Sequence, residues 1–275
     1  MMPNLPQMFD LTGKSAVVTG GAGLLGRQFC QTLAAAGASV SVVDIDAEAA
    51  KTVAQAINQA AGKALDIPTD ITQPDSVAAM VDTTLKAFGR LDILVNSAAL
   101  DPKFDPDSIT AQGQNAFETF PLPGWQQALD VNLTGMFLCS QAAARQMLEQ
   151  GEGVMINLCS MYGLVGPDQR LYQRQGQPPQ YKPVTYSVTK AGVLGLTQYL
   201  AAYYGAKNIR VNALTPGGVF NNHDAQFVEA YAARSVLGRM AEQDEMNGAL
   251  LFLASDASSY MTGSNLVVDG GWTAW

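Results

Sequence analysis

Short apolar segments of β type alternate with longer helical segments along most of this 275-residue chain. The strand-like segments are 15–19, 39–44, 63–67, 93–96, 154–158, 210–214 and 265–268. The helical segments between them are 24–36, 47–61, 74–88, 125–150, 186–205 and 243–254. Most strand-like segments are unbroken apolar runs, which is typical of strands that helices cover on both faces. The alternation therefore predicts a single α/β domain over residues 1–275, with a parallel sheet between helical layers.

The charge balance narrows the classes of partner. The chain has 16 Lys and Arg residues against 24 Asp and Glu residues, which gives a formal net charge of −8. Such a surface repels phosphate backbones and anionic lipids, so we expect neither a nucleic acid nor a membrane as partner. The sequence has no apolar run near the ~20 residues of a spanning helix and no signal-peptide pattern, so we expect a cytoplasmic protein.

The scarcity of histidine and cysteine limits the chemistry that is open to the chain. His223 is the only histidine, so a site with several histidine ligands is excluded. Cys30, Cys139 and Cys159 are too few and too scattered for a zinc knuckle. We therefore predict no metal, and we expect acid–base chemistry near neutral pH to depend on Tyr, Lys, Asp or Glu.

A glycine-rich turn connects the first strand-like segment to the first helical one. It runs from Thr19 to Gly26 and contains Gly20, Gly21 and Gly23. Such a turn lets the backbone approach a pyrophosphate, which the helix N-terminus then stabilises. Asp44 ends the next strand-like segment, where a carboxylate accepts hydrogen bonds from a ribose and repels a 2′-phosphate. This combination predicts NAD rather than NADP as the cofactor.

Tyr186 and Lys190 are four residues apart and so lie on one face of the helix predicted around them. A phenol with a pKa near 10 is a poor base, and lowering that pKa by about three units needs about 4 kcal/mol from a neighbouring cation. The spacing alone does not establish that Tyr186 acts as a base, because Tyr and Lys residues four apart are common on exposed helix faces. Ser160 follows a strand-like segment, at the edge where parallel sheets bind ligands.

These motifs together resemble the short-chain dehydrogenase/reductase family, single-domain branch, over roughly residues 11 to 272. Further matching pieces are Asp70-Ile71, 91–96, Asn132, 210–212, Pro216-Gly217 and 269–271. The resemblance implies a Rossmann fold with a seven-stranded, doubly wound parallel sheet, and a homo-oligomer, either a tetramer or a dimer. Residues 161–168 and 269–275 also resemble, more weakly, members linked to bacterial surface-sugar and flagellin-glycan pathways.

The resemblance also assigns roles to residues. Tyr186 is expected to be the general acid/base, Lys190 to lower its pKa and hold the nicotinamide ribose, Ser160 to bind the substrate oxygen, and Asn132 to anchor a water in the proton relay. The expected cofactor contacts are Gly20, Gly23, Leu25, Gly26, Asp44, Asp70, Ile71, Asn96, Ala98, Tyr186, Lys190, Pro216, Gly217 and Val219.

Three long irregular segments are expected to surround a small-molecule substrate: about 100–124, 166–183 and 219–236. The second is rich in glutamine and contains Arg170, Arg174 and Lys182, so it is expected to concentrate positive charge near the site. This composition favours a polyhydroxylated or anionic substrate, such as a sugar derivative. An equally weighted alternative is that the segment packs against a neighbouring subunit.

The sequence thus predicts an NAD(H)-dependent oxidoreductase that interconverts a secondary alcohol and a ketone. Two alternatives remain open. The spacing of Gly20, Gly23 and Gly26 resembles the extended branch of the family, which includes sugar epimerases and lyases. A non-catalytic dinucleotide sensor would need the same turn without the Tyr186 and Lys190 pair.

Overall fold

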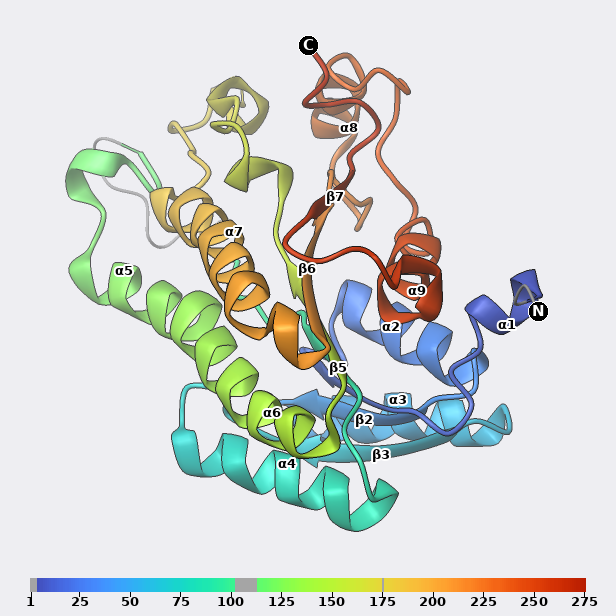
Figure 1. The fold of residues 1–275 in the computed structure, drawn as a ribbon. Coiled ribbons are helices and arrows are strands. Elements are labelled where there is room, and N and C mark those ends of the chain that lie inside the picture. The colour runs from blue at the N-terminus through green and yellow to red at the C-terminus, as the bar shows by residue number, and fades with distance from the viewer. Residues whose placement is uncertain (1–3, 102–112, 175) are drawn as a thin grey trace.

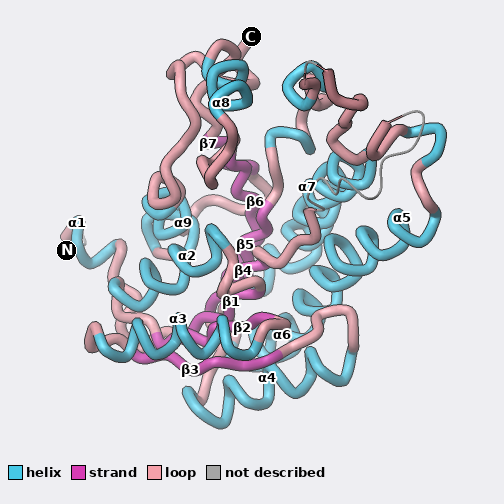
Figure 2. The backbone as a smooth tube through the Cα atoms, turned by 180° about the vertical axis from the view of Figure 1, so that it is seen from behind, coloured by secondary structure: helices cyan, strands magenta, loops and turns pink. Residues whose placement is uncertain are grey.

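The computed structural model describes residues 4–101, 113–174 and 176–275 of the chain. Part of the predicted 100–124 loop therefore lies outside the described residues. Seven strands form one sheet in the order β3-β2-β1-β4-β5-β6-β7, and every neighbouring pair is parallel. Figure 2 shows the strands lying side by side in this order. Their bounds are β1 (Ser15–Thr19), β2 (Ser39–Asp44), β3 (Lys63–Pro68), β4 (Ile93–Asn96), β5 (Gly153–Leu158), β6 (Ile209–Pro216) and β7 (Asn265–Val268).

Helices cover both faces of the sheet, as Figure 1 shows. One layer contains α2 (Leu24–Ala35), α3 (Ala47–Gln59) and α9 (Asn247–Ala254), whose buried residues form a core with β1 and β2. The other layer contains α4 (Pro74–Phe88), α6 (Met136–Gln150) and α7 (Val184–Tyr204). The remaining α-helices are α1 (Leu5–Met8), α5 (Leu122–Leu129) and α8 (Ala225–Ala232). The predicted doubly wound Rossmann architecture is confirmed.

Burial explains why these segments form these elements. β1 is buried along its whole length. Its consecutive residues Val17 and Val18 belong to the cores on opposite faces of the sheet. Phe29 of α2 and Met80 of α4 fill these two cores with fully buried side chains. Each such side chain contributes about 1.5–3 kcal/mol relative to an exposed one. A strand with apolar side chains on both faces is stable only between two layers of this kind.

The strand order reverses direction between β1 and β4. From β1 the chain winds outward to β2 and β3, whereas β4 and the later strands extend to the other side. The carboxyl ends of these two central strands therefore form a crevice, which is where open α/β sheets bind their ligands. Gly20, Asn96 and Ala98 all lie at or next to this point.

Two predicted segments differ from the structure. The helix predicted over residues 125–150 is instead α5, a π-helical segment η3 (Asp130–Gly135) and α6, and Figure 1 shows α5 and α6 nearly in line. The predicted loop 219–236 contains the helix α8, which begins because the Asp224 carboxylate accepts a hydrogen bond from the Phe227 amide. Both differences bear on the site described next.

Candidate active site

The glycine-rich turn has a backbone that tolerates no side chains at its key positions. Gly20 has a φ of +63°, and a Cβ there would lie 2.7 Å from the Cα of Ala98. A Cβ on Gly26 would lie 1.9 Å from the carbonyl oxygen of Gly20. Gly23 is the N-cap of α2, so the free amides at the start of this helix face the crevice. This cradle fits the pyrophosphate of a dinucleotide.

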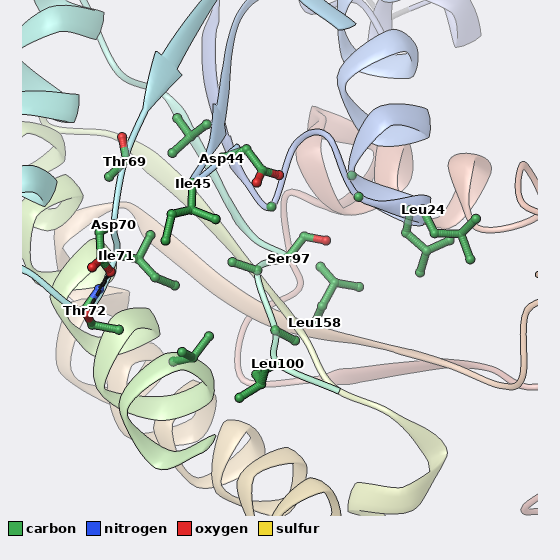
Figure 3. A pocket seen from close by; sticks show the side chains of 18 of the residues that line it. Leu24, Asp44, Ile45, Thr69, Asp70, Ile71, Thr72, Ser97, Leu100 and Leu158 are labelled. Carbon is green, nitrogen blue, oxygen red and sulfur yellow. Dashed lines mark hydrogen bonds between the residues drawn. The ribbon is translucent and has the colours of Figure 1, made fainter. Parts of the chain in front are cut away.

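A cleft with a volume of about 630 Å³ runs along the carboxyl ends of the central strands. Figure 3 shows Asp44, Ile45, Asp70 and Ile71 on one side of it and Leu24 on the other. Many of the predicted cofactor contacts line this cleft: Gly20, Gly23, Leu25, Gly26, Asp44, Asp70, Ile71, Ala98, Tyr186, Lys190 and Pro216. The structure thus brings together residues that are up to 196 positions apart, from 20 to 216.

The other predicted contacts lie close to this cleft but do not line it. Gly217 and Val219 line an adjacent cavity. Asn96 is 2% exposed, and its side-chain amide donates to Ser140 Oγ and Asn157 Oδ1 at 3.0 and 2.9 Å. The Asn96 side chain therefore fixes the end of β4 to neighbouring elements and does not line the cleft.

Asp44 is the last residue of β2 and lines the cleft. One carboxylate oxygen accepts from the Ala22 amide at 3.0 Å, and the other accepts from the Asp46 amide at 3.1 Å. These bonds tie the carboxylate to the glycine-rich turn and leave further lone pairs for donors in the cleft. A ribose has such donors, whereas a phosphate at the same place brings a like charge.

Ser160, Tyr186 and Lys190 meet where β5 ends and α7 begins. Ser160 lies two residues after the end of β5, and its hydroxyl accepts from the Tyr162 amide at 3.2 Å. Ser160 and Tyr186 line the same cavity. Lys190 is one turn beyond Tyr186 on α7, and its Nζ donates to the Leu158 carbonyl at 2.8 Å. Its ammonium lies 5.8 Å from the centre of the Tyr186 ring.

Burial dominates the electrostatics of these groups. It raises the pKa of Tyr186, and the charge of Asp101 adds to this, whereas the hydrogen bond from Ser160 acts in the opposite direction. Burial also lowers the pKa of Lys190 to about 8. Lys190 is therefore mostly protonated at neutral pH, and its charge sits in a poorly solvated site beside a phenol.

Asn132 lies in the π-helical segment and is 2% exposed. Its amide donates to the Leu100 carbonyl at 3.0 Å and to Thr189 Oγ1 at 3.1 Å, while its oxygen accepts from the Leu100 amide at 2.6 Å. It thus joins the segment after β4 to the helix that carries Tyr186 and Lys190. Single-turn π segments often occur at functional sites.

A second cavity of about 280 Å³ adjoins the cleft, and both are lined by Leu24, Leu25, Tyr186 and Pro216. Ser160 lines this second cavity, which we call the side cavity. Asp101, Tyr172, Phe227 and Tyr231 also line it, and they belong to the three segments expected from the sequence to surround the substrate. Met161, Tyr162 and Met240 line it as well and lie outside those segments. His223, the only histidine, also lines it. The spacing of Phe227 and Tyr231, four apart after a capping Asp224, is the signal that could have identified α8 as one of these walls.

The predicted excess of positive charge in segment 166–183 is wrong. Arg170 pairs with Asp168 at 2.8 Å, Arg174 with Asp224 at 2.6 Å, and Lys182 with Asp101 at 2.7 Å. Arg174 and Lys182 thus have carboxylate partners from distant parts of the chain, whereas Asp168, the partner of Arg170, also pairs with Arg234.

Within the described residues, no three or more His, Cys, Asp or Glu side chains are grouped so that they could hold a metal ion. No helix in the described part of the chain combines the length and the hydropathy needed to cross a membrane.

Comparison with known proteins extends over nearly the whole chain. A family model described as enoyl-(acyl carrier protein) reductase matches residues 21–273. The cis-4-hydroxycyclohexanecarboxylate dehydrogenase of Sinomonas cyclohexanicum is 37% identical over 263 residues, which cover 94% of this chain and 96% of that protein.

Solved structures agree with this. A short-chain type dehydrogenase/reductase from Mycobacterium marinum is 35% identical, with a TM-score of 0.86 over 99% of this chain and 100% of that one. A gluconate 5-dehydrogenase from Burkholderia cenocepacia J2315, solved with NADP and tartrate, is 30% identical, with a TM-score of 0.85 and the same coverage.

Proposed function

Because the chain belongs to the short-chain dehydrogenase/reductase family and is an oxidoreductase that acts on CH–OH groups, we propose that it interconverts a secondary alcohol and a ketone with NAD(H). The observation that supports this most directly is the position of Tyr186. It lines both the cofactor cleft and the side cavity, and Ser160 lines the side cavity as well. A nicotinamide in the cofactor cleft and a substrate in the side cavity would therefore meet at Tyr186.

The residues of the chain supply the proton chemistry. A nicotinamide in the cleft would accept the hydride, with its two electrons, from the alcohol carbon. Tyr186 accepts the proton of the alcohol oxygen as the C–O bond becomes C=O, and it returns a proton in the reverse direction. Ser160 donates to the same oxygen and orients it.

Lys190 makes this role possible for a phenol. Because burial raises the pKa of Tyr186, its phenolate form needs a nearby positive charge. The Lys190 ammonium, fixed by the Leu158 carbonyl, is on the same helix face one turn away. Asn132 contacts the same helix through its hydrogen bond to Thr189, the residue before Lys190. The side-chain oxygen of Asn132 accepts one hydrogen bond, from Leu100, and keeps one lone pair for a water of the proton relay.

Asp44 supports NAD as the cofactor. Its carboxylate, held by the Ala22 and Asp46 amides, would accept from a ribose and repel a 2′-phosphate. We expect Asp44→Ala to increase the use of NADP relative to NAD by at least tenfold in kcat/KM. An unchanged ratio would refute the like-charge argument.

The substrate is proposed to be a polar secondary alcohol, either cyclic or sugar-like. The two named dehydrogenases above act, by their names, on a hydroxycyclohexane carboxylate and on gluconate. The sequence argument for a sugar from the donors of segment 166–183 is weakened, because its cations are paired within the chain. An epimerase or lyase and a non-catalytic sensor receive no support from these relatives.

The test is a spectrophotometric panel. Absorbance of the reduced nicotinamide is followed with NAD and with NADP across ring alcohols, open-chain polyols and hydroxy acids. We expect NAD-linked turnover in the wild type and a loss of at least about 100-fold in kcat for Tyr186→Phe. Turnover that survives this substitution would remove Tyr186 from the role of acid/base, and no turnover of any alcohol or ketone would refute the proposed reaction.

A further inference from the structure

The side cavity has an aromatic wall, although the loop that closes it is rich in glutamine. Tyr172, Phe227 and Tyr231 line it, and Phe227 lies 5.7 Å from the Tyr172 ring and 6.2 Å from the Tyr231 ring. The thioethers of Met161 and Met240 complete this wall. Such a surface contacts the apolar face of a ring better than it contacts a hydrated open chain.

The polar atoms of this wall are largely used within the protein. The Tyr172 hydroxyl bonds to the Tyr162 hydroxyl at 3.2 Å. The Tyr231 hydroxyl accepts from the Gly218 amide at 2.6 Å and donates to the Met161 sulfur at 3.6 Å. These bonds hold the rings in place and occupy their hydroxyls.

Two glutamines of the loop, Gln169 and Gln173, bond to the backbone of the loop itself. Gln169 exchanges two hydrogen bonds with the backbone of Lys182, at 2.8 and 3.3 Å. Gln173 donates to the carbonyls of Gln180 and Gln169 at 2.7 and 3.2 Å. They shape the loop and fix the backbone from which the Lys182 side chain extends.

An ion pair between Asp101 and Lys182 is the charged feature of the side cavity. Both residues line the cavity together with Ser160, and both carboxylate oxygens of Asp101 lie 2.7 Å from Lys182 Nζ. The Lys182 side chain is 14% exposed, and its ammonium lies only 4.1 Å from the centre of the Tyr186 ring. The Lys182 ammonium therefore lies over the ring of the tyrosine that would carry the proton. His223, also in the wall, has its pKa lowered by burial and is neutral at pH 7.

The pair discriminates by charge. A hydroxyl can donate to Asp101 and accept from Lys182 without breaking the pair. A substrate carboxylate would have to displace Asp101, whose side chain is 44% exposed, or lie next to it, where the two negative charges repel each other. The cavity volume of about 280 Å³ is sufficient for a single ring.

We propose that Asp101 and Lys182 together bind a second, uncharged hydroxyl of the substrate, so that the substrate is a small cyclic diol. This rests on the proposed dehydrogenase activity. One hydroxyl lies at Ser160 and Tyr186 and is oxidised, the ring packs against Tyr172, Phe227 and Tyr231, and the second hydroxyl is bound unchanged by the ion pair. The product is then a cyclic hydroxyketone.

The test compares matched substrates within each enzyme variant. The substrates are cyclohexanol, the cyclohexane-1,2-, 1,3- and 1,4-diols, cis- and trans-4-hydroxycyclohexanecarboxylate, and the open-chain butane-2,3-diol. We expect the best cyclic diol to exceed cyclohexanol by about tenfold or more in kcat/KM, which corresponds to about 1.4 kcal/mol. We also expect it to exceed butane-2,3-diol and both carboxylates.

Two substitutions then assign the selectivity to the ion pair. Lys182→Met and Asp101→Asn should each bring the ratio of cyclic diol to cyclohexanol close to one. Asp101→Asn should in addition raise kcat/KM for a carboxylate by about tenfold, because it leaves the Lys182 ammonium without its carboxylate. Arg170→Met is the matched control: it removes a cation of the same loop whose side chain is 81% exposed, and it should leave every ratio unchanged.

The ratio is informative because damage to Tyr186 affects both substrates of a variant alike. Equal kcat/KM for cyclohexanol and every cyclic diol in the wild type, or a preference for a carboxylate, overturns the proposal. So do ratios that neither substitution changes. If only open-chain alcohols react, the cyclic substrate is refuted while the dehydrogenase stands. If no alcohol or ketone reacts with either nucleotide, both proposals fail.

Discussion

Replacing Lys190 by methionine should abolish activity and yet stabilise the fold at neutral pH. Lys190 is 4% exposed, and burial lowers its pKa from 10.5 to about 8. The gap between these values corresponds to about 3 kcal/mol, at about 1.4 kcal/mol for each pKa unit. This is the free energy that the folded state loses below pH 8 by keeping the ammonium buried. Methionine has a similar length and no charge, so Lys190→Met removes this cost.

One loss partly offsets this gain. The Lys190 Nζ donates to the Leu158 carbonyl at 2.8 Å, and removing one such hydrogen bond costs about 1 kcal/mol. We therefore expect the variant to be about 2 kcal/mol more stable than the wild type at pH 7.

The sign of the pH dependence follows from proton binding. Between pH 8 and pH 10.5 the unfolded wild type holds the Lys190 proton more than the folded protein does, so its stability rises with pH over this range. The variant lacks this contribution. Its advantage should therefore shrink by about 2–3 kcal/mol between pH 7 and pH 10 and should end near zero or slightly negative.

The assay is urea unfolding at fixed protein concentration without nucleotide, at pH 7, 8, 9 and 10, followed by tryptophan fluorescence. Lys51→Met is the control, because the Lys51 side chain is 51% exposed and its difference from the wild type should be the same at every pH. A Lys190→Met variant that is destabilised by the same amount at all four pH values would refute the reasoning.

Three further predictions concern the cradle, the π-helical segment and the assembly. Gly26→Ala should abolish dinucleotide binding in a fluorescence titration and lower the Tm, because its Cβ would lie 1.9 Å from the Gly20 carbonyl oxygen, whereas Gly248→Ala, with open space around it, should do neither. Asn132→Ala should cost about 2–4 kcal/mol in urea unfolding, since it leaves buried backbone groups unpaired, and it should reduce kcat. We expect light scattering to show that the wild type is a dimer or a tetramer. Tyr199 of α7 is 64% exposed, and we expect Tyr199→Glu to weaken this assembly. A monomeric wild type would contradict the prediction.

Much of the fold could be predicted from the sequence because the strands are buried on both faces. The predicted bounds of β1, β2, β4 and β7 agree with the structure to the residue. β3 and β5 differ by one residue at one end, and β6 differs by one residue at its start and two at its end. An unbroken apolar run has clear limits, and the glycine-rich turn fixes where β1 ends. The edge of each helix depends on capping contacts and was less precise.

The features that sequence reasoning missed depend on contacts between distant segments. The π-helical segment inside the predicted helix 125–150 contains Asn132, whose side chain bonds to Leu100 and to Thr189, 32 and 57 residues away. The charge of segment 166–183 depended on partners 50 and 81 residues away, Asp224 for Arg174 and Asp101 for Lys182. The composition of the segment shows its cations, whereas the carboxylates that pair with Arg174 and Lys182 come from other segments and are known only from the fold.

Tyr186 lies between two lysines of different electrostatic character. Lys182, four residues before it, is nearer to the ring but is paired with Asp101, so the pair acts on the phenol largely as a dipole. Lys190, four residues after it, has no ion-pair partner among the described residues and keeps its full charge in the same poorly solvated place. A full charge falls off more slowly with distance than a dipole, so Lys190 is the cation that can favour the phenolate despite the longer distance of 5.8 Å. The division leaves Lys182 free to bind substrate, and it explains why the fold tolerates a buried ammonium that destabilises it.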